Sequence, residues 1–210
     1  QPKILFHKSV SFELLVCSSS FFPAKPFGAF GDGGAIFTNN YEWAELIWSL
    51  RSHGRKREDK YDNWTIGFNS RLDTMQATIL LEKFNLFSTY ELKRSNEIAQ
   101  KYSKYLSNFV RTPIVPEGMR SSWAQYTIAL NSKEERVRIK SALNSIGIPT
   151  MIYYEKPLNK QMALKNALKM VELKNSECAA STVLSLPMHP FMEDNEVEFV
   201  VNSIGDFFKK

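Results

Sequence analysis

The sequence has few cysteines and no long apolar run, and both shortages exclude classes of protein. Only two cysteines, Cys17 and Cys178, occur among 210 residues, so neither a disulfide framework nor a cysteine-rich metal site is expected. This usage fits a reducing compartment, and we predict a cytoplasmic location. No apolar stretch reaches the about 18 residues that a membrane-spanning helix needs, so no membrane association is expected. The N-terminus also lacks the pattern of a signal peptide.

Histidine is scarce as well, with three residues in the chain. His53 and His189 have no partner at metal-ligand spacing, so we predict no metal and structural roles for both. The net charge is +5, and its densest basic stretch is Arg51–Arg57, which Glu58 and Asp59 follow at once. That pattern favours a solvated loop over contact with a polyanion. A phosphorylated small molecule or a neighbouring subunit remains an alternative contact for it, and no nucleic-acid partner is predicted.

The first half of the chain contains short strand patterns and amphipathic helices. Gly-rich residues lead into a predicted strand at 33–38, and Asn40 is expected to cap the helix that follows. A second helix should begin at Asp73, which forms a capping-box pattern with Gln76. Together with another helical pattern from residue 89 onward, it predicts a long helical connector.

Beyond Pro113 the pattern changes to that of an α/β lobe. We predict strands at 123–130 and 150–154 and helices at 133–146, 176–186 and 194–209. The expected fold class is therefore α/β, with a first part over 1–107 and a complete small domain over 108–210. The first part shows one clear strand without a partner, so it is not expected to bury a normal core by itself.

A lysine with apolar neighbours is the first candidate for chemistry. Lys25 lies among two prolines and three phenylalanines, Pro23, Pro26, Phe21, Phe22 and Phe27. Desolvation would lower the pKa of this lysine and leave a neutral amine, which can attack a carbonyl to form an imine. An exposed lysine that lies over aromatic neighbours is the more common alternative for such a pattern.

The segment 20–34 resembles the active-site segment of the DegT/DnrJ/StrS family of nucleotide-sugar aminotransferases, which depend on pyridoxal 5'-phosphate (PLP). In that family Ser-Phe-x-Pro-x-Lys introduces the lysine and Gly-Asp-Gly-Gly follows, as here. Similar blocks follow in the family's order at 50–54, 66–77, 122–127, 147–154 and 186–190. The resemblance implies a partial fold-type-I PLP-transferase large domain with its connecting helix, followed by the small C-terminal α/β domain.

The resemblance also implies an activity and partners. It implies transamination of a nucleotide-linked keto sugar, with glutamate as the amino donor, in surface polysaccharide or glycan biosynthesis. The blocks around residues 69–73 and 149–154 are most similar to the UDP-sugar branch of the family. A homodimer is implied for the full-length form, because members of the family build each active site from two subunits. The related sugar dehydratases lack the Schiff-base lysine, so Lys25 argues against them.

Residue roles follow from the resemblance position by position. Lys25 matches the Schiff-base lysine, which also moves a proton during the reaction. Ser20 matches a hydroxyl that contacts the cofactor phosphate, and Asn69 matches an asparagine that binds this phosphate in the neighbouring subunit's pocket. As alternatives, Ser20 could cap a turn and Asn69 could only position the helix at Asp73.

Three further residues match positions at the substrate site. Arg71 matches a residue that faces the other subunit's substrate, where a guanidinium suits a diphosphate or a carboxylate. Tyr153 and Tyr154 match a pair near the sugar-binding mouth. As alternatives, Arg71 could position the following helix and the tyrosines could be strand core.

The resemblance is incomplete upstream of the lysine. Only 24 residues precede Lys25, and residues 1–17 do not resemble the family. Members of the family carry there a phosphate-binding loop, a ring that stacks on the pyridine, and an aspartate in an Asp-Ala-Ala-Gln block that protonates the pyridine nitrogen. We therefore expect a truncated member of doubtful activity. The alternative is a non-catalytic remnant that does not bind the cofactor.

Overall fold

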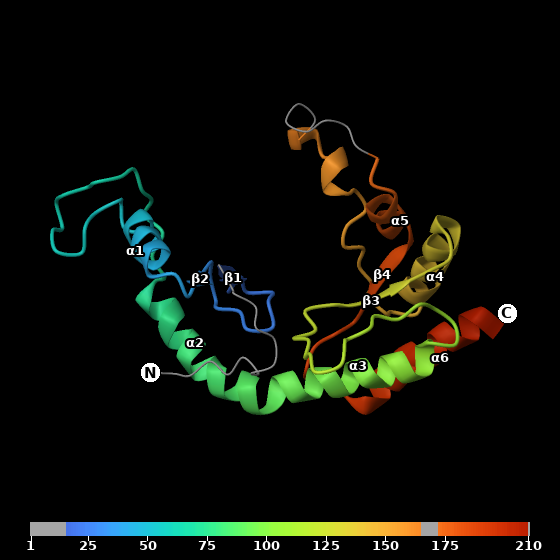
Figure 1. The fold of residues 1–210 in the computed structure, drawn as a ribbon. Coiled ribbons are helices and arrows are strands. Elements are labelled where there is room, and N and C mark those ends of the chain that lie inside the picture. The colour runs from blue at the N-terminus through green and yellow to red at the C-terminus, as the bar shows by residue number, and fades with distance from the viewer. Residues whose placement is uncertain (1–15, 165–171, 210) are drawn as a thin grey trace. The chain divides into compact units, whose positions relative to one another are not determined.

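The structure is a computed structural model that describes residues 16–164 and 172–209. It divides into two compact units, residues 1–85 and residues 86–210. The sequence pattern instead predicted a boundary between residues 107 and 108. The division lies earlier because helix α3 (Leu92–Leu106) packs against helix α6 (Asp194–Lys209) of the second unit (Figure 1).

The first unit contains a two-stranded antiparallel sheet. Strand β1 (Cys17–Ser20) pairs with β2 (Gly34–Phe37), so the strand predicted at 33–38 has the partner that the sequence did not reveal. Helix α1 (Tyr41–Leu50) follows. Its N-cap is Asn40, as predicted, with the side-chain oxygen accepting a hydrogen bond from the Trp43 amide at 3.0 Å.

Helical residues then run without a break from Thr74 to Leu106. Helix α2 (Thr74–Leu86) is followed by a π-helical segment, η1 (Phe87–Glu91), and by α3. Asp73 caps the start of α2 by accepting from the Met75 amide at 2.8 Å. Gln76 does not complete the predicted capping box, because its side-chain oxygen accepts from the Phe30 amide at 2.9 Å.

The second unit joins a small sheet to helices. Strand β3 (Tyr126–Ala129) pairs antiparallel with β4 (Val183–Leu186). The remaining elements are α4 (Lys133–Ser145), two 3-10 turns η2 (Leu158–Lys160) and η3 (Met162–Leu164), α5 (Lys174–Thr182) and α6. Helix α4 starts at the cap Ser132 and is followed by Gly147, whose φ of +81° suits the predicted stop.

Two predicted elements of this unit are wrong. The helix predicted at 176–186 ends at Thr182, and residues 183–186 form β4, which is almost fully buried between β3 and α4. The strand predicted at 150–154 is reduced to a single bridge between Met151 and Ser185. At residues 183–186 pairing with the distant strand β3 decided the conformation, and the local pattern did not.

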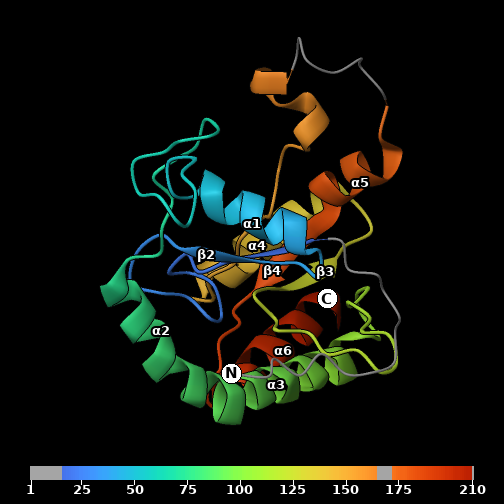
Figure 2. The same ribbon diagram turned by 60° about the vertical axis from the view of Figure 1, so that its left-hand side comes forward.

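The main core lies within the second unit. Apolar side chains of α3, β3, α4, β4 and α6 close around each other, among them Ile98, Tyr102, Ile128, Leu184 and Ile204. Figure 2 shows α3 and α6 side by side, as in Figure 1. In the first unit, Ala29 and Leu80 are the buried apolar residues of its described part. The sequence analysis made its expectation of little core for residues 1–107, but residues 86–107 lie in the second unit, where α3 contributes to the main core.

Candidate functional site

The loop that carries Lys25 connects β1 to β2 and closes on itself. The Phe21 amide donates to the Gly33 carbonyl at 2.8 Å, and the Ala29 amide donates to the Phe21 carbonyl at 2.7 Å. Within this ring the Lys25 amide donates to the Phe22 carbonyl at 2.9 Å. The backbone around the lysine is therefore fixed by its own hydrogen bonds.

Helix α2 anchors this loop from outside. The Gln76 side chain binds the Phe30 amide, and the Lys83 ammonium donates to the Gly28 carbonyl at 2.6 Å. Phe27 adds an edge-to-face contact with Phe84 on the same helix, with 5.8 Å between ring centroids. The sequence analysis missed Gln76 and Lys83 as supports of the lysine loop. They lie 46 and 55 residues from their partners, and no local pattern indicates such pairs.

The Lys25 side chain is exposed. Its ammonium has no hydrogen-bond or ion-pair partner in the described part of the chain. The aromatic neighbours do not cover it, because Phe21 and Phe27 pack on each other, with ring centroids 5.7 Å apart, and Phe22 is exposed. The expected desolvation of Lys25 by its sequence neighbours is therefore wrong for this chain. Its amine is instead accessible and unpaired.

Ser20 lies at the end of β1, directly before the lysine loop, and is exposed. Its hydroxyl oxygen accepts a hydrogen bond from the Phe22 amide at 3.3 Å, which is the turn role considered as an alternative. A hydroxyl that accepts one bond still has its own hydrogen to donate. Ser20 can thus hold the turn and bind an anion at the same time.

Asn69 lies on a segment that crosses the end of α1. The Phe68 amide donates to the Leu50 carbonyl at 2.6 Å, and the Ser70 amide donates to the Arg51 carbonyl at 2.9 Å. Gly54 and Gly67 face each other at this crossing, where a Cβ on either one would collide with the other segment's backbone. The two glycines permit the close approach that holds Asn69 in place.

Asn69 and Arg71 are brought together by their side chains. The Asn69 oxygen Oδ1 accepts from Arg71 Nε at 3.2 Å and from Nη2 at 3.1 Å. Both residues are exposed, so each keeps donors that a ligand can reach.

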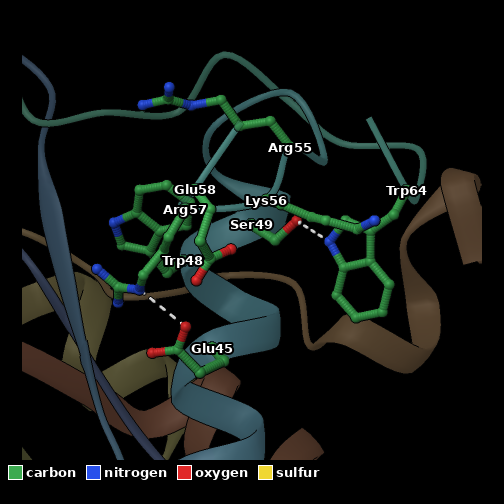
Figure 3. Close-up of a pocket in the computed structure, with 8 residues that line it drawn as sticks. All are labelled: Glu45, Trp48, Ser49, Arg55, Lys56, Arg57, Glu58 and Trp64. Carbon is green, nitrogen blue, oxygen red and sulfur yellow. Dashed lines mark hydrogen bonds and ion pairs between the residues drawn. The ribbon is translucent and has the colours of Figure 1, made fainter. Parts of the chain in front are cut away.

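The basic segment Arg51–Arg57 borders a pocket of about 140 Å³ beside α1 (Figure 3). Arg57 pairs with Glu45 at 2.8 Å, and its guanidinium lies 4.3 Å from the ring centroid of Trp48. On the other side of the pocket, the Trp64 indole donates to the Ser49 hydroxyl at 2.9 Å. These contacts tie the basic loop to its own helix.

Tyr153 and Tyr154 lie in the second unit, just after the bridge at Met151. Their rings meet edge to face, with centroids 5.6 Å apart. Tyr154 is 72% exposed and Tyr153 is 37% exposed, so neither belongs to a buried strand core, which was the alternative to a substrate role.

Metal-ligating side chains do not gather in threes anywhere in residues 16–164 and 172–209. None of the helices in these ranges has both the length and the apolar character needed to cross a bilayer.

Comparison with known proteins gives a match over most of the chain. Residues 9–205 match the model of the DegT/DnrJ/EryC1/StrS aminotransferase family. This match includes residues 9–17, which the sequence analysis had left outside the resemblance; residues 1–15 lie outside the described part of the structure.

Individual proteins agree with the family match. The chain is 38% identical over 186 residues to a UDP-2-acetamido-2-deoxy-3-oxo-D-glucuronate aminotransferase of Pseudomonas aeruginosa, covering 88% of this chain and 50% of that one. A DegT/DnrJ/EryC1/StrS aminotransferase structure from Brucella abortus superposes with a TM-score of 0.86 at 42% identity, covering 93% of this chain and 52% of that chain.

A third protein was solved with a cofactor. NtdA of Bacillus subtilis, with bound PMP, superposes with a TM-score of 0.85 at 28% identity, over 93% of this chain and 46% of that one. The chain thus spans about half the length of the relatives it matches.

Proposed function

Because the chain belongs to the DegT/DnrJ/EryC1/StrS aminotransferase family, whose members are PLP-dependent, we propose that it serves transamination of a nucleotide-linked keto sugar. The Pseudomonas relative acts, by its name, on a UDP-linked 3-oxo sugar, and this supports a UDP-linked substrate here. Glutamate as the amino donor and a place in surface polysaccharide or glycan biosynthesis belong to the same proposal. So does a cytoplasmic location.

The observation that carries the proposal is Lys25. It presents an unpaired, exposed amine on a loop that its own hydrogen bonds and helix α2 hold in place. The Ser20 hydroxyl and, from the neighbouring subunit, the Asn69 amide would be further donors, and a phosphate needs donors of this kind. The donors that two copies of this chain offer therefore fit the phosphate of PLP, and the Lys25 amine fits its aldehyde carbon.

In this proposal PLP, when bound, supplies the electron sink that makes a carbon–hydrogen bond beside the amino group acidic. Lys25 would hold the cofactor through its amine. The same amine would carry the proton between Cα of the amino compound and C4′ of the cofactor. Ser20 and Asn69 bind the phosphate and so fix the position of the reacting carbon.

Arg71 would bind a diphosphate or carboxylate of the sugar nucleotide, and Tyr153 with Tyr154 would contact the sugar. The first unit would belong to the cofactor-binding large domain and the second would be the small domain. A homodimer, in which Asn69 and Arg71 serve the neighbouring subunit's site, completes it.

The test is the colour of the protein with PLP. We expect the protein to be yellow with PLP and borohydride to bleach this absorbance. The same treatment should leave a stable mass increase on the peptide containing Lys25. Lys25→Ala should abolish both signals, whereas Lys60→Ala, an exposed lysine of the same unit, should leave them unchanged. A colourless wild-type protein without the mass increase would favour a member that does not bind the cofactor.

A further inference from the structure

We propose that Arg71 is a positioning residue for Asn69. Its guanidinium holds the carbonyl oxygen of the Asn69 side chain, which leaves both Nδ2 hydrogens to donate to the cofactor phosphate. The inference rests on the proposed function, in which Asn69 binds that phosphate. It adds a second role to Arg71, beyond the contact with substrate.

The two contacts define the orientation of the amide. Arg71 Nε and Nη2 both lie within 3.2 Å of Asn69 Oδ1. A guanidinium has only donors, so the carbonyl oxygen is the end of the amide that can face it. Phosphate oxygens only accept, so the anion needs the opposite end. The Asn69 amide thus accepts from Arg71 through Oδ1 and can donate to the phosphate through Nδ2.

The backbone below this pair is fixed. Asn69 forms an antiparallel bridge with Ser52, which is 3% exposed, and the Ser70 amide binds the Arg51 carbonyl. Only the Asn69 side-chain torsions remain to be set, and Arg71 sets them. Neither Asn69 Nδ2 nor Arg71 Nη1 has a partner within the described ranges, so these donors are available to a ligand.

Without Arg71 the amide can rotate and present its oxygen to the anion, which is repulsive. The substitution Arg71→Lys separates this effect from charge, because lysine keeps the positive charge and loses the forked contact from two nitrogens. Arg71→Lys should therefore weaken phosphate binding through Asn69.

The test is a double-mutant cycle on the full chain, with PLP and pyridoxal as probes and the dissociation constant as the readout. Arg71→Lys should raise the constant for PLP roughly five- to tenfold, the size expected for loss of one charge-assisted hydrogen bond, and leave that for pyridoxal unchanged. In an Asn69→Ala background Arg71→Lys should have no further effect. An equal effect in both backgrounds would overturn the inference, since Arg71 would then act without Asn69.

A second measurement does not need the cofactor. The side-chain amide resonances of Asn69, assigned by their loss in Asn69→Asp, should report a rigid group in the wild-type chain and a mobile one in Arg71→Lys. Equal mobility in both proteins would also overturn the inference. A wild-type chain that does not bind PLP would count against the proposed function, and the amide measurement would still decide the role of Arg71.

Discussion

At the scale of single residues, the lysine loop depends on the absence of a side chain at Gly28. Gly28 lies inside the ring of hydrogen bonds around Lys25, where a Cβ would stand 2.6 Å from the Phe22 oxygen and 2.7 Å from the Pro23 oxygen. Both obstacles are backbone atoms of the same loop, so neither can move without opening it. The loop's geometry therefore requires glycine here for space.

We predict that Gly28→Ala destabilises this loop by about 1–3 kcal/mol, the usual cost of overpacking. Hydrogen exchange of the Ala29 amide, which binds the Phe21 carbonyl, should become faster. Ala24→Ser, at an exposed position of the same loop, is the matched control. Equal exchange rates in Gly28→Ala and wild type would show that the loop can accommodate a Cβ at residue 28.

At the scale of elements, α3 is joined to the sheet through tyrosines. Tyr102 on α3 packs against Tyr126 on β3, with 5.0 Å between ring centroids, and donates to the Pro187 carbonyl just after β4 at 2.9 Å. Both side chains are fully buried. Burial raises the pKa of Tyr102 and, less strongly, that of Tyr126, because a buried phenolate loses its hydration.

These shifts predict a loss of stability at alkaline pH. Tyrosines of the unfolded chain titrate near about pH 10, whereas the folded chain keeps these protons to higher pH. The free energy of unfolding should thus be unaffected below about pH 10 and fall as the pH rises above it. Urea unfolding between pH 8 and 11, followed by circular dichroism, measures it.

Tyr102→Phe supplies the check on this prediction. It should lower stability at pH 8 by about 1 kcal/mol through the lost hydrogen bond, and flatten the decline above pH 10. Tyr61→Phe, at a side chain that is 85% exposed, should change neither. An unchanged alkaline slope in Tyr102→Phe would contradict the assignment.

At the scale of the whole molecule, burial is distributed unequally. The main core belongs to residues 86–210, and the described part of residues 1–85 buries only Ala29 and Leu80 among its apolar side chains. Large apolar side chains of the first unit are exposed, including Phe30, Trp43 and Met75. A substitution in one unit is therefore expected to change the stability of that unit and to leave the stability of the other unchanged.

We predict that Ile204→Ala, in the core between α3 and α6, destabilises the second unit by about 2–5 kcal/mol, the usual range for a large-to-small core substitution. Hydrogen exchange should accelerate across residues 86–164 and 172–209 and stay unchanged in the lysine loop. Gly28→Ala should give the reverse pattern, and Asn202→Ala, exposed on the same helix as Ile204, should give neither. Acceleration in both units from one substitution would show that they unfold together.

Sequence alone was sufficient for much of this protein. It determined the α/β class, the Asn40 and Asp73 caps, the long helical run and helices α4 and α6, because each is encoded by residues a few positions apart. It also determined the family, through motif blocks that surround Lys25 and Asn69.

Only the tertiary structure decided what surrounds the candidate site. Residues 183–186 form a strand because they pair with β3, and a four-residue segment with three apolar side chains does not by itself distinguish strand from helix. Gln76 and Lys83 support the lysine loop, and Arg71 orients Asn69, through side-chain hydrogen bonds whose geometry no spacing encodes. The exposure of Lys25 was likewise invisible in its apolar neighbours, because those rings pack on each other and on α2.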